Sequence, residues 1–117
     1  MNSMSKDRRR APADRRLTER VPAVFAVKKT LGPNVQLCQA EDLTPSGMTM
    51  KRPRGTFIIP RTEVDLTFAL PGSTEQISAR GVVVHDVVAG TYRRTGVRFI
   101  AVRPDHQQLI AGYCRRG

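Results

Sequence analysis

Three arginines close to the start of the chain have the side chains and the spacing to hold a ligand that carries phosphate. They are Arg15, Arg16 and Arg20, in the order Arg-Arg-x-x-x-Arg. A guanidinium is a planar group that donates to phosphate, pairs with the O6 and N7 acceptors of guanine, and stacks on bases. Because arginine runs are also common in solvated basic tails, these residues predict an anionic ligand only in combination with a second feature.

The second feature is a group of polar residues further along the chain, in the pattern Asp42-x-Thr44-x-x-Gly47. A carboxylate can accept hydrogen bonds from the N1–H and the exocyclic amine of guanine, which are donors. A threonine hydroxyl can donate or accept, and a glycine lets the backbone turn without a side chain that would obstruct a ligand. Taken alone, the same residues are typical of a turn between two strands. Together, the two groups predict a site for a nucleotide with guanine bases.

The order and the spacing of the two groups resemble the PilZ domain family, whose members are receptors for the bacterial second messenger cyclic di-GMP. The family pattern is Arg-x-x-x-Arg, often with a preceding arginine, followed by Asp/Asn-x-Ser-x-x-Gly. The later segment 96–99, Gly-Val-Arg-Phe, is similar to a late strand of the family, and the resemblance extends from about Arg15 to Tyr113. By this resemblance the ligand-binding residues are Arg15, Arg16, Arg20, Asp42, Thr44 and Gly47.

The resemblance implies a cyclic di-GMP receptor without catalytic activity, in which ligand binding orders an arginine arm and a downstream protein reads the change. Control of motility, surface polysaccharide or virulence is typical of the family. Arg15 stands where an additional arginine in the family is associated with an intercalated pair of ligands, which implies two ligands per site. Thr44 departs from the family's serine: it keeps the hydroxyl, but its added methyl group stiffens the side chain.

Two other functions are compatible with the sequence. A PilZ-like adaptor that acts through protein contacts alone, without nucleotide, is favoured by the departure at Thr44. A nucleic-acid-binding barrel is favoured by the formal net charge of +10, from 20 basic and 10 acidic residues, because a basic surface attracts polyanions. The chain has two Tyr, four Phe and no Trp, which are few platforms for stacked bases. We therefore expect cyclic di-GMP and a protein as partners, and no nucleic acid.

The composition changes after the first twenty residues. Residues 1–20 hold seven basic and three acidic residues with a single Leu, and such a segment cannot bury enough surface to fold alone. We therefore expect a flexible basic arm over residues 1–14, followed by one PilZ-like domain over residues 15–117.

From Val21 onward, apolar residues alternate with other residues in short runs, which is typical of β-strands separated by Gly- and Pro-containing turns. Near the end of the chain, Pro104 suits the first turn of a helix that continues to about Cys114. This rhythm of short strands and turns is typical of a small antiparallel barrel or sandwich, and the barrel is favoured because closure of the sheet removes exposed edges. Together with the resemblance, we expect a mainly β fold, a six-stranded antiparallel PilZ-like barrel with a short C-terminal helix. The positions that define the six strands are Val21, Ala23, Phe25 and Val27; Val35 and Leu37; Met48 and Met50; Val64, Leu66, Phe68 and Leu70; Ile77, Ala79, Gly81 and Val83; and Thr95, Val97, Phe99 and Ala101.

No group of residues indicates catalysis or metal binding. His85 and His106 have no recognisable partners for acid–base chemistry, and Cys38 and Cys114 have no metal-like spacing, so both are expected to be reduced and buried. No run approaches the ~18 apolar residues of a membrane span, and the polar N-terminus lacks the apolar region of a signal peptide. We expect no enzyme, no metal, no cofactor, no membrane contact and a cytoplasmic location.

Overall fold

The structure is a computed structural model that describes residues 21–22 and 24–116. The arm predicted over residues 1–14 lies outside the described residues, and so do Arg15, Arg16 and Arg20. The predictions for the arm and for these three arginines therefore stay predictions.

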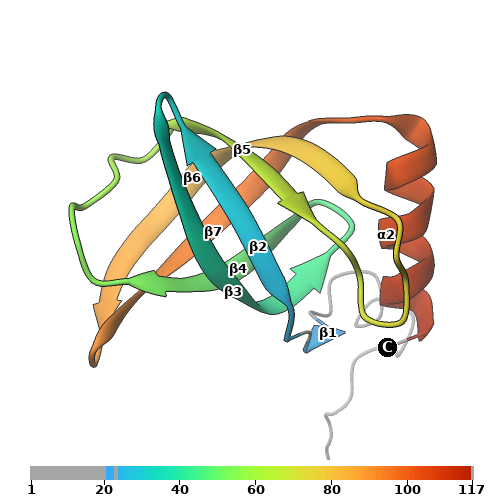
Figure 1. Ribbon diagram of the computed structural model, residues 1–117, viewed down its shortest axis with the longest axis horizontal. Coiled ribbons are helices and arrows are strands. Elements are labelled where there is room, and N and C mark those ends of the chain that lie inside the picture. The colour runs from blue at the N-terminus through green and yellow to red at the C-terminus, as the bar shows by residue number, and fades with distance from the viewer. Residues whose placement is uncertain (1–20, 23, 117) are drawn as a thin grey trace, which may run out of the picture.

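Within residues 24–116, six strands form a closed antiparallel barrel (Figure 1). The strands follow one another around the barrel in the order β3-β2-β5-β6-β7-β4, and a further pairing between β3 and β4 closes the sheet. The six-stranded antiparallel barrel that the sequence predicts is thus confirmed. Its strands are β2 (Ala26–Leu31), β3 (Asn34–Thr44), β4 (Gly47–Pro53), β5 (Glu63–Phe68), β6 (Ile77–Ala89) and β7 (Tyr92–Val102).

The predicted first strand, by contrast, is divided into two. The short strand β1 (Val21–Pro22) pairs with the end of β3, with Val21 opposite Leu43 and Pro22 opposite Asp42, whereas β2 begins only at Ala26. At the same level, a bulge around Glu41 shifts the register between β3 and β4. A bulge bends the strand that contains it, and the neighbouring strand is interrupted where this bend occurs. Strand β1 therefore lies beside Asp42 and is separate from β2.

A C-terminal helix, α2 (Pro104–Arg116), lies against the end of β3 (Figure 1). Gln107 Nε2 donates a hydrogen bond to Pro45 O at 2.9 Å, and Cys114 Sγ donates to Leu43 O at 3.7 Å. Ile110 is fully buried and joins the helix to the barrel core. The predicted helix is confirmed and continues two residues beyond Cys114. No helix in the described part of the chain is long and apolar enough to cross a membrane.

The barrel interior is aliphatic, and the strand pattern determines which residues face it. On β3 the buried residues are Cys38, Ala40 and Leu43. Val35 and Leu37, which defined the predicted strand, are 62% and 69% exposed. Both cysteines are free; Cys38 is buried as expected, but Cys114 is only half-buried. The largest fully buried aliphatic side chains are Leu43, Met50, Leu66, Ile77, Ile110, Val27, Val64 and Val83.

One charged cluster is enclosed among these apolar residues. The carboxylate of Asp86, on β6, accepts hydrogen bonds from the side chains of Arg52 at 2.7 Å, Arg93 at 2.9 Å and Thr95 at 2.6 Å, and from the backbone N–H of Ile58 at 2.9 Å. The side chain of Asp86 is 0% exposed and that of Arg52 is 3% exposed. The cluster therefore ties β4, β6, β7 and the loop after β4 together through one carboxylate.

This cluster predicts that the stability of the protein falls between about pH 4 and about pH 2. Burial alone would raise the pKa of Asp86, but the hydrogen bonds from its partners outweigh burial and lower the pKa from 3.8 to about 2. A carboxyl group with a depressed folded-state pKa stabilises the protein above its unfolded pKa, and this contribution is lost as the pH falls through the folded value. The difference corresponds to about 2 kcal/mol.

Urea unfolding measured at a series of pH values would test the prediction. Asp86→Asn removes the titrating group at the same position, so its free energy of unfolding should change less over this pH range than that of the native chain. An identical pH dependence in the two proteins would contradict the assignment to Asp86.

Candidate ligand-binding site

The second predicted motif lies at the β3–β4 turn and lines a shallow pocket of about 200 Å³. Asp42, Thr44 and Gly47 meet there with residues of β6 and β7, among them His85 and Arg98. The structure thus brings together three of the six predicted site residues. The other three, the arginines of the arm, lie outside the described residues.

The turn is held by the side chain of Thr44. Its Oγ1 accepts a hydrogen bond from Ser46 N at 3.1 Å and lies 3.3 Å from both Ser46 Oγ and the carbonyl oxygen of Gly47, to which it donates. Thr44 and Gly47 are also the last paired residues of the β3–β4 ladder. The threonine at the position of the family's serine therefore shapes the turn that closes one side of the pocket.

Two glycines allow close contacts within the pocket. A Cβ atom on Gly47 would lie 2.2 Å from Val97 O, so a side chain there would push β4 away from β7. A Cβ on Gly96 would lie 2.2 Å from Cε1 of His85, because the imidazole ring rests directly against that backbone. The close approach of β4 to β7 therefore depends on Gly47, and the position of the imidazole depends on Gly96.

Arg98 adds a positive charge to this pocket. It lies on β7 opposite Gly47 in the strand register, and its side chain is exposed. Among the described residues it forms no ion pair. An exposed guanidinium beside a pocket that also contains Asp42 offers donors to a ligand, while the carboxylate offers acceptors.

Arg98 and His85 are not among the site residues that the motifs predict. Arg98 stands within the segment that is similar to a late strand of the family, and His85 has no neighbouring partner in the sequence. Their place in the pocket depends on the β6–β7 register, in which His85 lies opposite Gly96. The sequence contained one signal for Arg98: Gly96 and Arg98 alternate along a strand and so share one of its faces. This signal points to the pocket only when it is known that this face borders the pocket.

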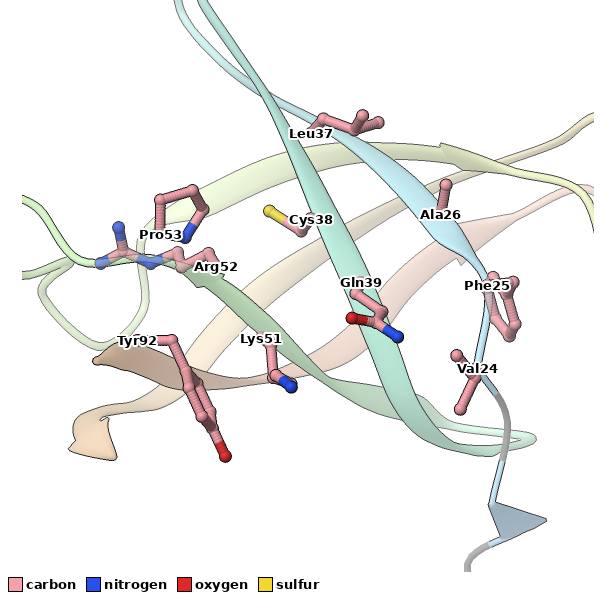
Figure 2. Close-up of a pocket in the computed structure, with 10 residues that line it drawn as sticks. All are labelled: Val24, Phe25, Ala26, Leu37, Cys38, Gln39, Lys51, Arg52, Pro53 and Tyr92. Atoms are coloured by element: carbon pink, nitrogen blue, oxygen red, sulfur yellow. The ribbon is translucent and has the colours of Figure 1, made fainter. Parts of the chain in front are cut away.

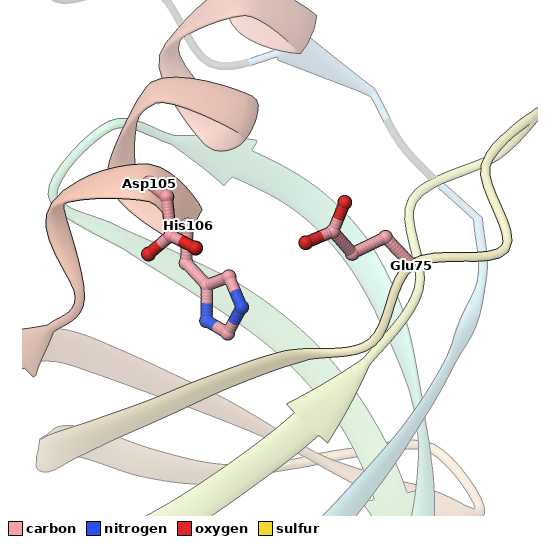
Figure 3. A group of neighbouring side chains, drawn as sticks. All are labelled: Glu75, Asp105 and His106. Atoms are coloured by element: carbon pink, nitrogen blue, oxygen red, sulfur yellow. The ribbon is translucent and has the colours of Figure 1, made fainter.

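A separate group of potential metal ligands lies where α2 meets the barrel (Figure 3). Glu75, Asp105 and His106 place one ligand atom each within 4.8 Å of one another. His106 is buried, and its Nδ1 accepts the N–H of Ser78 at 3.3 Å. A neutral imidazole that accepts at Nδ1 carries its proton on Nε2, which leaves no lone pair there for a metal. Asp105 is moreover paired with Arg103 at 2.9 Å. Within this group, the hydrogen bond between Ser78 and His106 is the contact that joins the helix to β6.

Comparison with known proteins identifies the fold. The model of the PilZ domain family matches residues 14–116. The Bacillus subtilis inhibitor of motility MotI/DgrA is similar in structure, with a TM-score of 0.76 and 19% identity, over 83% of this chain and 48% of that chain. The PilZ domain of Escherichia coli YcgR with c-di-GMP has a TM-score of 0.66 and 14% identity, over 83% of this chain and 86% of that chain. The PilZ domain of CeSA from a cellulose-synthesizing bacterium has a TM-score of 0.64 and 18% identity, over 82% of this chain and 98% of that chain. The chain spans about half the length of the motility inhibitor. A search of the curated proteins found no match.

Proposed function

The chain belongs to the PilZ domain family, and from this membership we propose that it is a cyclic di-GMP receptor whose site joins the segment 15–20 to the pocket of Asp42, Thr44 and Gly47. The observation that carries the proposal is the pairing of β1 with β3, in which Pro22 lies opposite Asp42. Arg20 directly precedes the strand β1, and consecutive Cα atoms are about 3.8 Å apart. In the sequence the arginine motif thus ends one residue before a strand that pairs beside Asp42, and Asp42 lines the pocket.

In this site each charged group binds a different part of the ligand. Arg15, Arg16 and Arg20 donate to the phosphates and to guanine O6 and N7, and Asp42 accepts from the guanine N1–H and exocyclic amine. Arg98, which lines the same pocket, provides a fourth guanidinium. Each charge-assisted hydrogen bond contributes about 1.5–3 kcal/mol, whereas ordering a segment costs about 2–5 kcal/mol. Micromolar affinity, about −8 kcal/mol, is within the reach of such a set.

The proposed output is a change of surface that a downstream protein reads. Arm residues that fold against the pocket on ligand binding convert a nucleotide signal into a new protein surface. Two similar structures support the two halves of this proposal: the YcgR domain was solved with c-di-GMP, and MotI/DgrA is an inhibitor of motility. No catalytic step is part of the proposal.

A second candidate function is an adaptor that needs no nucleotide. It is favoured by the engagement of Thr44, whose Oγ1 is hydrogen-bonded within the turn to Ser46 N and Gly47 O. A hydroxyl that is occupied in this way contributes less to a ligand. The two candidates differ in one measurable property, which is the binding of cyclic di-GMP.

Titration calorimetry of the purified chain with cyclic di-GMP tests the proposal, with GMP as the control ligand. We expect saturable binding at two ligands per site. Arg16→Ala and Asp42→Ala should each weaken binding at least about tenfold, the equivalent of one lost interaction of about 1.4 kcal/mol.

Arg103→Ala is the matched control, because it removes one positive charge from an exposed residue that does not line the pocket. It should leave the affinity unchanged. An absence of heat at high ligand concentration would favour the nucleotide-independent adaptor. An equal loss in Arg103→Ala and Arg16→Ala would show attraction by net charge alone.

A further inference from the structure

A groove of about 520 Å³ is lined by residues of β2, β3, β4 and β7 and of the segment before β2 (Figure 2), and it shares no lining residue with the proposed nucleotide pocket. In Figure 2 the side chains of Lys51 and Tyr92 lie on one side of β3, and Val24 lies on the other. Val24 is 68% exposed and Leu37 is 69% exposed. Large apolar side chains exposed together in a concave surface are typical of a site that another molecule covers.

The charge around this groove is positive. Lys28 lies directly opposite Leu37 in the β2–β3 register, and the Lys51 amine is 4.6 Å from the centroid of the Tyr92 ring. Neither lysine forms an ion pair within the described part of the chain. The neighbouring carboxylate, Glu41, is occupied by a salt bridge of 2.8 Å with Arg94. The groove thus offers an apolar floor with two ammonium groups beside it.

From this arrangement we infer that the groove docks a segment of a partner protein in which apolar side chains are flanked by carboxylates. Leucine-sized side chains would cover Leu37 and Val24, and carboxylates would pair with Lys28 and Lys51. Opposite charges across an interface guide the encounter and select against wrong partners.

Two other occupants fit this charge less well. The chain's own residues 1–20 contain seven basic and three acidic residues, so they carry the same sign as the groove. A second copy of the chain, related by two-fold symmetry, would bring the same lysines toward each other. Like charges brought together across an interface are costly.

The groove is close to the segment that ligand binding is proposed to order. Val24 lines the groove, and it follows the strand Val21–Pro22, which pairs with β3 beside Asp42. If the nucleotide holds the arm in place, it also limits the positions that Val24 can take at one end of the groove. This inference rests on the proposed function, which requires a downstream partner. It adds that the partner presents apolar side chains flanked by carboxylates.

Nuclear magnetic resonance of the full ¹⁵N-labelled chain can test the docking surface with a short synthetic peptide of leucine and glutamate spaced by serine. We expect shift changes at Leu37, Lys51 and Tyr92. A peptide with glutamine in place of glutamate, and one with serine in place of leucine, should each bind at least about tenfold more weakly. Leu37→Asp and Lys51→Glu should weaken binding of the first peptide by a similar factor.

Ile59→Asp is the matched control, because Ile59 is 68% exposed, like Leu37, but does not line the groove. It should leave peptide binding unchanged. Shift changes confined to other surfaces, equal losses in Leu37→Asp and Ile59→Asp, or dimerisation through this face would overturn the inference. Cyclic di-GMP titration of Leu37→Asp should match the native chain, so a failed nucleotide site and a failed docking surface are told apart.

Discussion

Replacing Asp86 with alanine is expected to lower the free energy of unfolding by about 3–5 kcal/mol, the typical cost of removing one partner from a buried ion pair. The side chain of Arg52 is 3% exposed, so its charge would stay in the barrel without the carboxylate that neutralises it. Thr95 Oγ1 and Ile58 N would lose the same acceptor. Native stabilities are only about 5–15 kcal/mol, so the variant would lose a large part of the total.

Urea unfolding at neutral pH measures this effect, and Asp65→Ala is the matched control. The ion pair of Asp65 with Arg80 has a similar separation of 3.0 Å, but both side chains are more than half exposed. Exposed pairs contribute about 0–1 kcal/mol, so the control should remain near native stability. A loss in Asp86→Ala no larger than in Asp65→Ala would show that the buried cluster does not stabilise the barrel.

Replacing Gly47 with alanine is expected to impair both the fold and the proposed site. The added Cβ would lie 2.2 Å from Val97 O, which belongs to the backbone of β7. Backbone cannot move aside as a flexible side chain can, so β4 and β7 must separate. Overpacking of this kind costs about 1–3 kcal/mol. Because the same strands form the pocket, we also expect affinity for cyclic di-GMP to fall at least about tenfold.

Thermal unfolding and ligand titration of the same protein preparation would measure the two effects. Gly55→Ala serves as the control, because its added Cβ would meet only Pro53 O at 3.9 Å, an ordinary contact distance. If a stable Gly47→Ala protein bound cyclic di-GMP with native affinity, the ligand would not bind in this pocket, and the proposed site would be wrong.

The alternation of apolar with other residues along the sequence predicted the fold class, because this period is typical of β-strands. The aliphatic residues from Val64 to Leu70 and from Ile77 to Val83 have the period of strands with one buried face, and these strands line the core. Such a pattern does not say which face is buried when both carry apolar residues. Val35 and Leu37 therefore marked a strand correctly and are nonetheless exposed, while the smaller Cys38 and Ala40 face the interior.

The sequence by itself determined that this chain forms short alternating strands with a terminal helix, and that Asp42, Thr44 and Gly47 stand together at a turn, because period and turn chemistry are local properties. The period alone is typical of a sandwich as well as of a barrel. Only the tertiary structure decided which residues surround that turn and which charged side chains meet inside the barrel. Arg52 reaches Asp86 across 34 positions, and His85 rests on Gly96 through a register that contains an irregularity between Val83 and His85. Register depends on the pairing of whole strands, and a shift of one residue would turn each side chain to the other face.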